Sequence, residues 1–117
     1  MNSPIQRHQS GPTLSRAVQY GPFVFIAGTT ADIKTVDCHG QTLEILQKID
    51  ALLATCGSDK SKILSCTIWL ADMNEKPLMD RAWLAWVDPN NKPARACVEA
   101  KLGSADTRVE IMMTAAQ

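Results

Sequence analysis

The strongest constraint on the fold is a helical pattern of apolar residues between Cys38 and Cys56. Apolar or small side chains recur there at steps of three and four residues, so they form one stripe along a helix. The stripe comprises Thr42, Ile45, Leu46, Ile49, Leu52, Leu53 and Cys56. Glu44 and Lys48 lie four residues apart on the polar side, and Gly57 stands where such a helix would end. A single apolar stripe needs a second layer to cover it, which the strand-like segments on either side can supply.

Five segments have the composition or the alternation of strands, and a second helix is predicted among them. The predicted strands are residues 16–20, 23–27, 63–70, 94–100 and 108–115. Gly21-Pro22 would turn the first strand into the second, whose unbroken apolar run favours a strand covered on both faces. In the third strand one face would carry Leu64, Cys66, Ile68 and Leu70. Asn74 would cap the second helix, Pro77 falls in its first turn, and its apolar stripe is Met79, Ala82, Trp83, Trp86 and Val87.

This order, β-β-α-β-α-β-β, predicts an α/β (α+β) sandwich in which two helices cover one face of a mixed sheet. We expect one domain over residues 1–117, with residues 1–13 as a loose N-terminal arm, because 117 residues suit a single core. The other sheet face would be half apolar, with Thr67, Trp69, Cys97 and Met112 on or near it. An uncovered face of this kind favours assembly into a closed ring.

Composition excludes several classes of function. Twelve basic and twelve acidic residues give a formal net charge of zero, and no basic stripe suggests a nucleic-acid partner. The apolar runs are too short to span a membrane, and the N-terminus lacks the pattern of a signal peptide. The four cysteines have no CxxC spacing and the two histidines have no third ligand at motif spacing, so we expect no metal site. Reduced thiols in a cytoplasmic protein are the expected state.

The segment Lys92–Ala100 combines a small, apolar face with a polar one. Its alternation places the alanines and Val98 on a half-buried face, and Arg95, Cys97 and Glu99 on the other. The planar guanidinium of Arg95 can bind two oxygens of a carboxylate or phosphate at once. Arg95 would equally suit a salt bridge or a subunit contact. Gly28, at the end of an earlier strand, would suit either a plain strand end or a close approach of the backbone to a ligand.

At these residues the chain resembles the RidA/YjgF family, the reactive intermediate deaminases, which are also described as endoribonuclease L-PSP proteins. The most specific part is residues 93–99, which keep every fixed letter of the family pattern P-A-R-x-C-V-E. Residues 25–28, 52–58, 67–72 and 109–111 also match family segments in order, so the resemblance covers roughly residues 12–116. It implies a chorismate mutase-like fold, a homotrimer with pockets between subunits, and no metal or organic cofactor. The implied activity is hydrolysis of 2-imino acids, or their enamine tautomers, to 2-keto acids and ammonia.

The resemblance also assigns roles to residues. Arg95 would clamp the substrate carboxylate and Glu110 would orient the attacking water or transfer a proton. Cys97 would line the pocket, chiefly through its backbone N–H and its packing. Gly28 and Thr29 would border the pocket, where their backbone could bind the substrate. A small buried cysteine and a solvated glutamate are the simpler interpretations of Cys97 and Glu110.

Three positions depart from the family pattern. Leu14 stands where many members have a tyrosine, Thr29 where members often have a glutamine, and Asp80 where the second helix often has an asparagine. The segment between Thr30 and Cys38 is also shorter than usual. These departures concern the side of the pocket that meets the imine, so they bear on substrate range and on the activity itself.

Two other functions compete with the deaminase. A non-catalytic trimeric binding module for a small carboxylate would need Arg95 but not Glu110. A ribonuclease, as the L-PSP label suggests, is disfavoured because the sequence has no histidine pair, metal cluster or basic groove for RNA cleavage.

Overall fold

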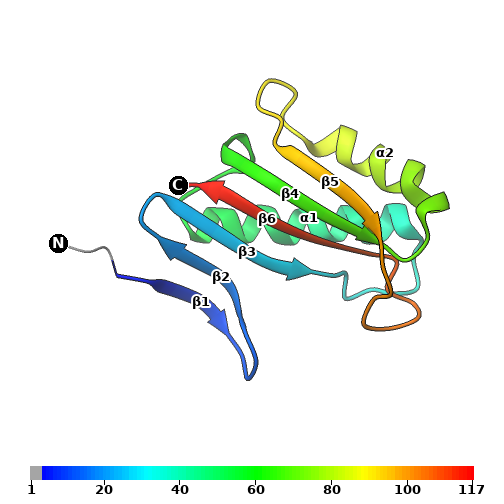
Figure 1. The fold of residues 1–117 in the computed structure, drawn as a ribbon, viewed down its shortest axis with the longest axis horizontal. Coiled ribbons are helices and arrows are strands. Elements are labelled where there is room, and N and C mark those ends of the chain that lie inside the picture. The colour runs from blue at the N-terminus through cyan, green and yellow to red at the C-terminus, as the bar shows by residue number, and fades with distance from the viewer. Residues whose placement is uncertain (1–3) are drawn as a thin grey trace.

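The computed structural model describes residues 4–117, which form one six-stranded sheet and two α-helices (Figure 1). In chain order the elements are β1 Gln6–Ser10, β2 Ser15–Tyr20, β3 Phe23–Thr29, α1 Cys38–Thr55, β4 Ile63–Leu70, α2 Lys76–Trp86, β5 Ala94–Glu99 and β6 Val109–Ala116. Short 3-10 helices precede β4 (Lys60–Lys62) and α2 (Met73–Glu75). Neither α1 nor α2 is long and apolar enough to cross a membrane.

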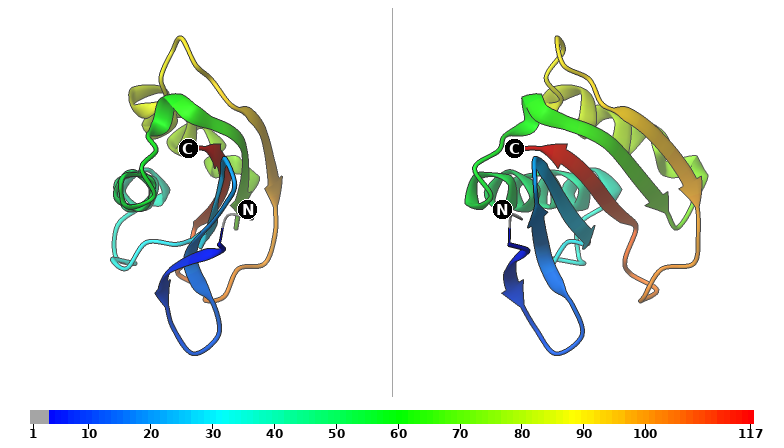
Figure 2. Two further views of the ribbon diagram at one scale, coloured as in Figure 1. Left: turned by 90° about the vertical axis from the view of Figure 1, so that its left-hand side faces the viewer. Right: turned by 60° about the vertical axis from the view of Figure 1, so that its left-hand side comes forward.

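The sheet has the strand order β1-β2-β3-β6-β4-β5. Neighbouring strands are antiparallel except β4 and β5, which run parallel and are joined through α2. Both helices lie on one side of the sheet, as the edge-on view makes clear (Figure 2). The predicted mixed sheet with two helices on one face is therefore confirmed, and β4 lies between the last two strands of the chain, β5 and β6.

Helix α1 forms as its apolar stripe predicted. The side chains that recur at three- and four-residue steps are buried against the sheet: Thr42, Ile45, Leu46, Ile49, Leu52 and Leu53. Asp37 caps the helix by accepting a hydrogen bond from the backbone N–H of Gly40 at 2.9 Å. Gly57 follows the helix with φ +73°, a left-handed conformation that glycine adopts without steric cost. The Glu44–Lys48 pair forms on the polar side, with 3.4 Å between carboxylate oxygen and ammonium nitrogen.

Two predicted details of the N-terminal region and α2 were wrong. Residues 6–10, expected to be part of a loose arm, form the edge strand β1 in antiparallel register with β2. Residues 1–3 of that arm lie outside the described residues. Asn74 does not cap α2: it lies in the 3-10 helix before α2, where its N–H donates to Asp72, while Pro77 does fall in the first turn.

The faces of two strands also differ from the prediction. The pairing of β4 with β6 shifts between Ile63 and Ser65, so Leu64 is exposed while Ile63 and Cys66 are buried. On β5 the alanines and Val98 face away from the helices, and Arg95 and Cys97 face α2 and the core. Cys97 therefore does not lie on the uncovered sheet face where it was expected.

The sheet face opposite the helices carries exposed hydrophobic side chains. Phe23 and Phe25 on β3, Val98 on β5 and Met112 on β6 are each between 42% and 46% exposed. Residues 23–27 of β3 were predicted to be covered on both faces, but within one chain only Val24 and Ile26 of these five are buried. Because the four side chains come from three strands of one sheet, they form a broad apolar surface, which we call the open face.

Candidate functional site

Arg95 is held by two residues of α2. Its Nη1 atom lies 2.9 Å from Oδ1 of Asp80, and its Cζ atom lies 5.2 Å from the centroid of a Trp83 ring. The side chain of Arg95 is 22% exposed and that of Asp80 is 26% exposed. The guanidinium of Arg95 is thus held against α2, over Trp83 and beside Asp80.

Asp80 also receives a hydrogen bond from Lys76, 2.6 Å from Nζ to Oδ2. Its other oxygen faces Arg95 as an ion pair and not as an aligned hydrogen bond. Burial alone would raise the pKa of the Asp80 carboxyl, but the hydrogen bond from Lys76 and the positive charges of Arg95 and Lys76 outweigh it, and the pKa is lowered. Asp80 is therefore an anion beside Arg95 at neutral pH, and one side of the guanidinium is already neutralised.

Cys97 follows Arg95 on the same face of β5. It is half-buried, packs against the core, and lies in register with the buried Ile68 of β4. Burial raises the pKa of the Cys97 thiol, although the charges of Arg95 and Lys76 oppose the effect. The protonated thiol is a poor nucleophile, so the geometry favours the packing role that was predicted for this residue.

Glu110 lies on the opposite face of the sheet from Arg95. Its neighbours Val109 and Ile111 are fully buried on the helix side, and Glu110 is in register with Trp69 of β4. The carboxylate lies against Gly28 of β3: a Cβ atom at Gly28 would stand 2.2 Å from Oε2 of Glu110. Glycine at this position therefore leaves the space that the carboxylate occupies.

The pairing of β3 is irregular at Ala27 and Gly28. The β3–β6 pairing shifts between Ile26 and Thr29, both of which are buried, so Ala27 and Gly28 project toward the open face. Thr29 faces α1, and its hydroxyl donates to the carbonyl of Ala27 at 2.9 Å. The backbone of Gly28 and Thr29 was expected to border the pocket. The Thr29 side chain is buried on the helix side, whereas a Cβ at Gly28 would point toward Glu110 on the open face.

Leu14 lies just before β2, in the turn that joins it to β1. It is 50% exposed, and its carbonyl accepts a hydrogen bond from the N–H of Gly11 at 2.8 Å. An exposed apolar side chain on a tight turn is available to a second chain or to a ligand.

The predicted site residues thus fall into two groups. Arg95 and Cys97 lie on the helix side at the β5 edge, and Glu110 and Gly28 lie on the open face. Because alternate residues of a strand point to opposite faces, one chain cannot bring Arg95 and Glu110 into one pocket. A pocket that contains both would need two chains.

Sequence reasoning missed the contact of Arg95 with Trp83. The tryptophan was assigned to the apolar stripe of α2, where it does lie, and nothing in its spacing indicated an arginine above its ring. Among residues 4–117 no three histidine, cysteine, aspartate or glutamate side chains lie close enough to hold a metal ion.

The chain is similar to known proteins over nearly its whole length. Residues 5–117 match the family model described as Endoribonuclease L-PSP. A RutC family protein of Haemophilus ducreyi is 41% identical over 102 residues, which are 87% of each chain. YoaB, a RutC family protein of Escherichia coli, is 45% identical over 80 residues, or 68% of this chain and 70% of YoaB.

Solved structures agree with this relationship. A YjgF family member from Neisseria meningitidis superimposes with a TM-score of 0.95 at 37% identity, covering 100% of this chain and 98% of the other. The fold, the Pro93–Glu99 motif and these matches lead to one conclusion. The protein belongs to the RidA/YjgF family, in which the predicted resemblance placed it.

Proposed function

We propose that the protein is a cytoplasmic 2-imino acid deaminase that works as a homotrimer. The observation that carries the proposal is the guanidinium of Arg95, held in a fixed orientation by Asp80 and Trp83 at the edge of the sheet within the family motif. A planar guanidinium fixed in this way can receive the carboxylate of a small 2-imino acid through two parallel hydrogen bonds.

The reaction needs little more than substrate positioning. A protonated imine carbon is already electrophilic, so water can add to it without an activated serine or cysteine nucleophile. Water forms a C–O bond at the imine carbon and passes a proton to Glu110. The same proton then moves to the nitrogen. As the C–N bond breaks, Glu110 takes the hydroxyl proton of the carbinolamine, a 2-keto acid forms, and the proton leaves with ammonia as ammonium. No electron donor or acceptor is required.

The separation of Arg95 from Glu110 within one chain supports a homotrimer with the site between chains. Arg95 and Glu110 lie on opposite faces of one sheet, so they can cooperate only when two chains meet. The open face, with four hydrophobic side chains exposed in one chain, offers the surface on which copies would pack. Free cysteines at all four positions support a reducing compartment.

The alternative is a trimeric module that binds a small carboxylate without turnover. The specific observation that favours it is Asp80, which already pairs with Arg95 and repels an incoming carboxylate. Such a module would keep its ligand affinity after Glu110→Gln, whereas the deaminase would lose turnover.

Imine turnover tests the proposal. An amino acid oxidase generates 2-imino acids in the assay, and semicarbazide reports those that remain free in solution. We expect the wild-type protein to compete with semicarbazide and Arg95→Ala to lose this effect. Arg81→Ala is the matched control, because Arg81 is an exposed arginine of α2. Failure of the wild type on every imine would contradict the catalytic assignment.

A further inference from the structure

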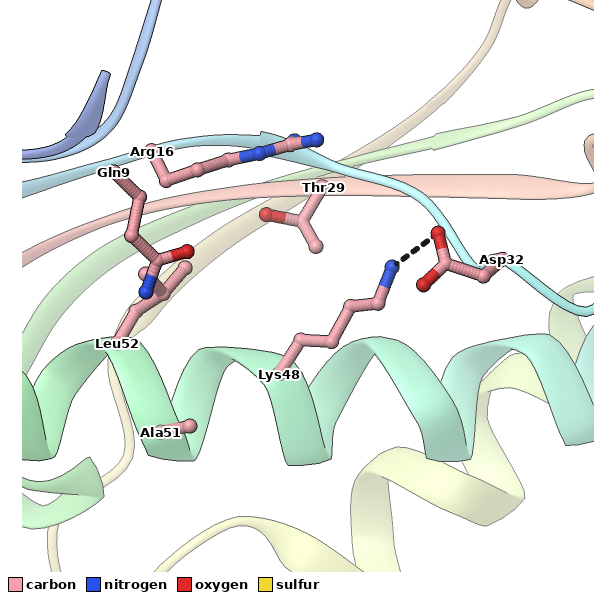
Figure 3. A pocket seen from close by; sticks show the side chains of 7 residues that line it. All are labelled: Gln9, Arg16, Thr29, Asp32, Lys48, Ala51 and Leu52. Carbon is pink, nitrogen blue, oxygen red and sulfur yellow. Dashed lines mark ion pairs between the residues drawn. The ribbon is translucent and has the colours of Figure 1, made fainter. Parts of the chain in front are cut away.

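A cavity lies on the helix side of the sheet, away from Glu110. Its volume is about 280 Å³, and it opens between the sheet and α1 (Figure 3). Its lining residues are Gln9, Arg16, Thr29, Asp32, Lys48, Ala51 and Leu52. They come from β1, β2, β3 and α1 and from the segment that follows β3, and neither Arg95 nor Glu110 is among them.

The two cations in this cavity differ in how far they are neutralised. Lys48 extends from α1 and places Nζ 2.9 Å from Asp32 Oδ1, 2.9 Å from the carbonyl of Thr30 and 3.4 Å from Glu44. Arg16 extends along the opposite wall above Thr29, as Figure 3 shows. Within the part of the chain that the structure describes, residues 4–117, no ion pair engages the Arg16 guanidinium.

Lys48 is paired with both Asp32 and Glu44, so Arg16 is the cation of the lining that forms no ion pair within residues 4–117. The guanidinium of Arg16 also helps to lower the pKa of Asp32, after the larger effect of the Lys48 hydrogen bond and charge. Asp32 is therefore ionised, and it would repel a ligand with two negative charges more strongly than one with a single charge. The planar fork of Arg16 suits a carboxylate.

The backbone of Gln9 departs from regular strand geometry at this cavity. Its φ is +52°, which is uncommon for a residue with a side chain, and the β1–β2 pairing is interrupted where Gln9 would oppose Arg16. The Gln9 amide points into the cavity toward Leu52 (Figure 3). The cavity thus combines neutral hydrogen-bonding groups with an apolar floor of Ala51 and Leu52.

We propose that this cavity binds a small organic monocarboxylate, with Arg16 as the group that holds the carboxylate and Leu52 as the contact for its short carbon chain. The volume suits a metabolite of a few carbon atoms. The site is distinct from the Arg95 site and does not depend on imine chemistry, so either can fail without the other.

The test is a titration with 2-oxobutyrate, followed by calorimetry and by amide shifts in NMR spectra. The starting protein is Arg95→Ala, in which the proposed catalytic site cannot hold a carboxylate. We expect one saturable site per chain, with shifted amides around Thr29 and Arg16. Adding Arg16→Gln should weaken binding by about tenfold or more, because a charged hydrogen-bond partner is lost. Inorganic phosphate should bind more weakly than 2-oxobutyrate.

A second variant removes space and leaves the charge in place. Ala51→Leu adds a side chain at the cavity wall with little effect on helix propensity, and it should also weaken binding. Ala54→Leu is the matched control, since Ala54 is an exposed alanine of the same helix outside the lining. Circular dichroism checks that each variant folds. If Arg16→Gln does not fold, the binding measured with Ala51→Leu tests the proposal.

Three outcomes would overturn the proposal. One is no saturable binding at concentrations on the order of 10 mM. Another is binding that survives both Arg16→Gln and Ala51→Leu in folded protein. The third is phosphate binding at least as tight as 2-oxobutyrate binding.

Discussion

Replacement of Gly28 by alanine should displace the Glu110 carboxylate while changing the stability of the fold only slightly. An added Cβ would stand 2.2 Å from Oε2 of Glu110, whereas ordinary contacts begin at 3.4 Å. The oxygen must therefore move by about 1.2 Å. The nearest atom is the end of a flexible side chain, so the carboxylate can rotate away without any shift of the backbone.

The expected effect on stability is small. Gly28 has no left-handed φ, so alanine fits its backbone and removes freedom from the unfolded chain, a gain of about 0.5 to 1 kcal/mol. A strained rotamer of Glu110 would cost about 0.5 to 1.5 kcal/mol. The two effects nearly cancel, and the free energy of unfolding should change by less than about 1 kcal/mol.

The expected effect on turnover is large. Displacement of a catalytic group by about 1 Å costs on the order of 100-fold in rate. The assay is imine turnover together with urea denaturation of the same preparations. Gly103→Ala is the control, because a Cβ there meets no atom within 4 Å. Full turnover by a stable Gly28→Ala protein would refute the role given to the Glu110 carboxylate.

Three further predictions concern the arginine, the open face and the thiols. Asp80→Asn should release the guanidinium of Arg95 and lower KM for imino acids, at a cost of about 1 kcal/mol in stability. Folding lowers the pKa of Asp80 from its usual 3.8. The wild type should therefore be more stable than Asp80→Asn by a constant amount above about pH 5, and this difference should shrink as the pH falls below 3.8. Denaturation of both proteins across this pH range measures the difference. Phe25→Glu should give monomers in light scattering, because Phe25 is 46% exposed in one chain and its replacement leaves the core intact; an unchanged trimer would contradict the assembly surface. A disulfide reagent at pH 8 should label at most Cys97 in the native protein and all four cysteines in urea. Cys97 is the one cysteine of the four that is not buried, and burial raises the pKa of the Cys66 thiol to about 12. Rapid labelling of several native thiols would contradict this prediction.

The sequence correctly predicted those elements in which apolar, buried positions recur with a regular period. The apolar period of α1 and the glycine that follows it located the helix correctly, since burial against the sheet determines both. Strand β1 could not be found in this way. Its residues are all exposed or half-buried, and it is held by backbone pairing with β2, which leaves no hydrophobic pattern.

The orientation of β5 shows a second limit. Alternation correctly separated Arg95 and Cys97 from the alanines, but hydrophobicity assigned the wrong set to the core. The arginine faces inward because β5 is an edge strand next to α2, where the Trp83 ring lies against its guanidinium and Asp80 neutralises its charge. Those partners come from another element, so local sequence cannot reveal them.

In the proposed active site, Arg95 of one chain and Glu110 of another act together. The direct measurement is imine turnover by mixed trimers, in which Arg95→Ala and Glu110→Gln chains carry different tags and are purified through both. Each parent protein should be inactive. Every mixed trimer would contain one interface with both residues intact, so about a third of the wild-type rate should return. If mixed trimers form but no activity returns, the site is not shared between chains in this way and the account is wrong.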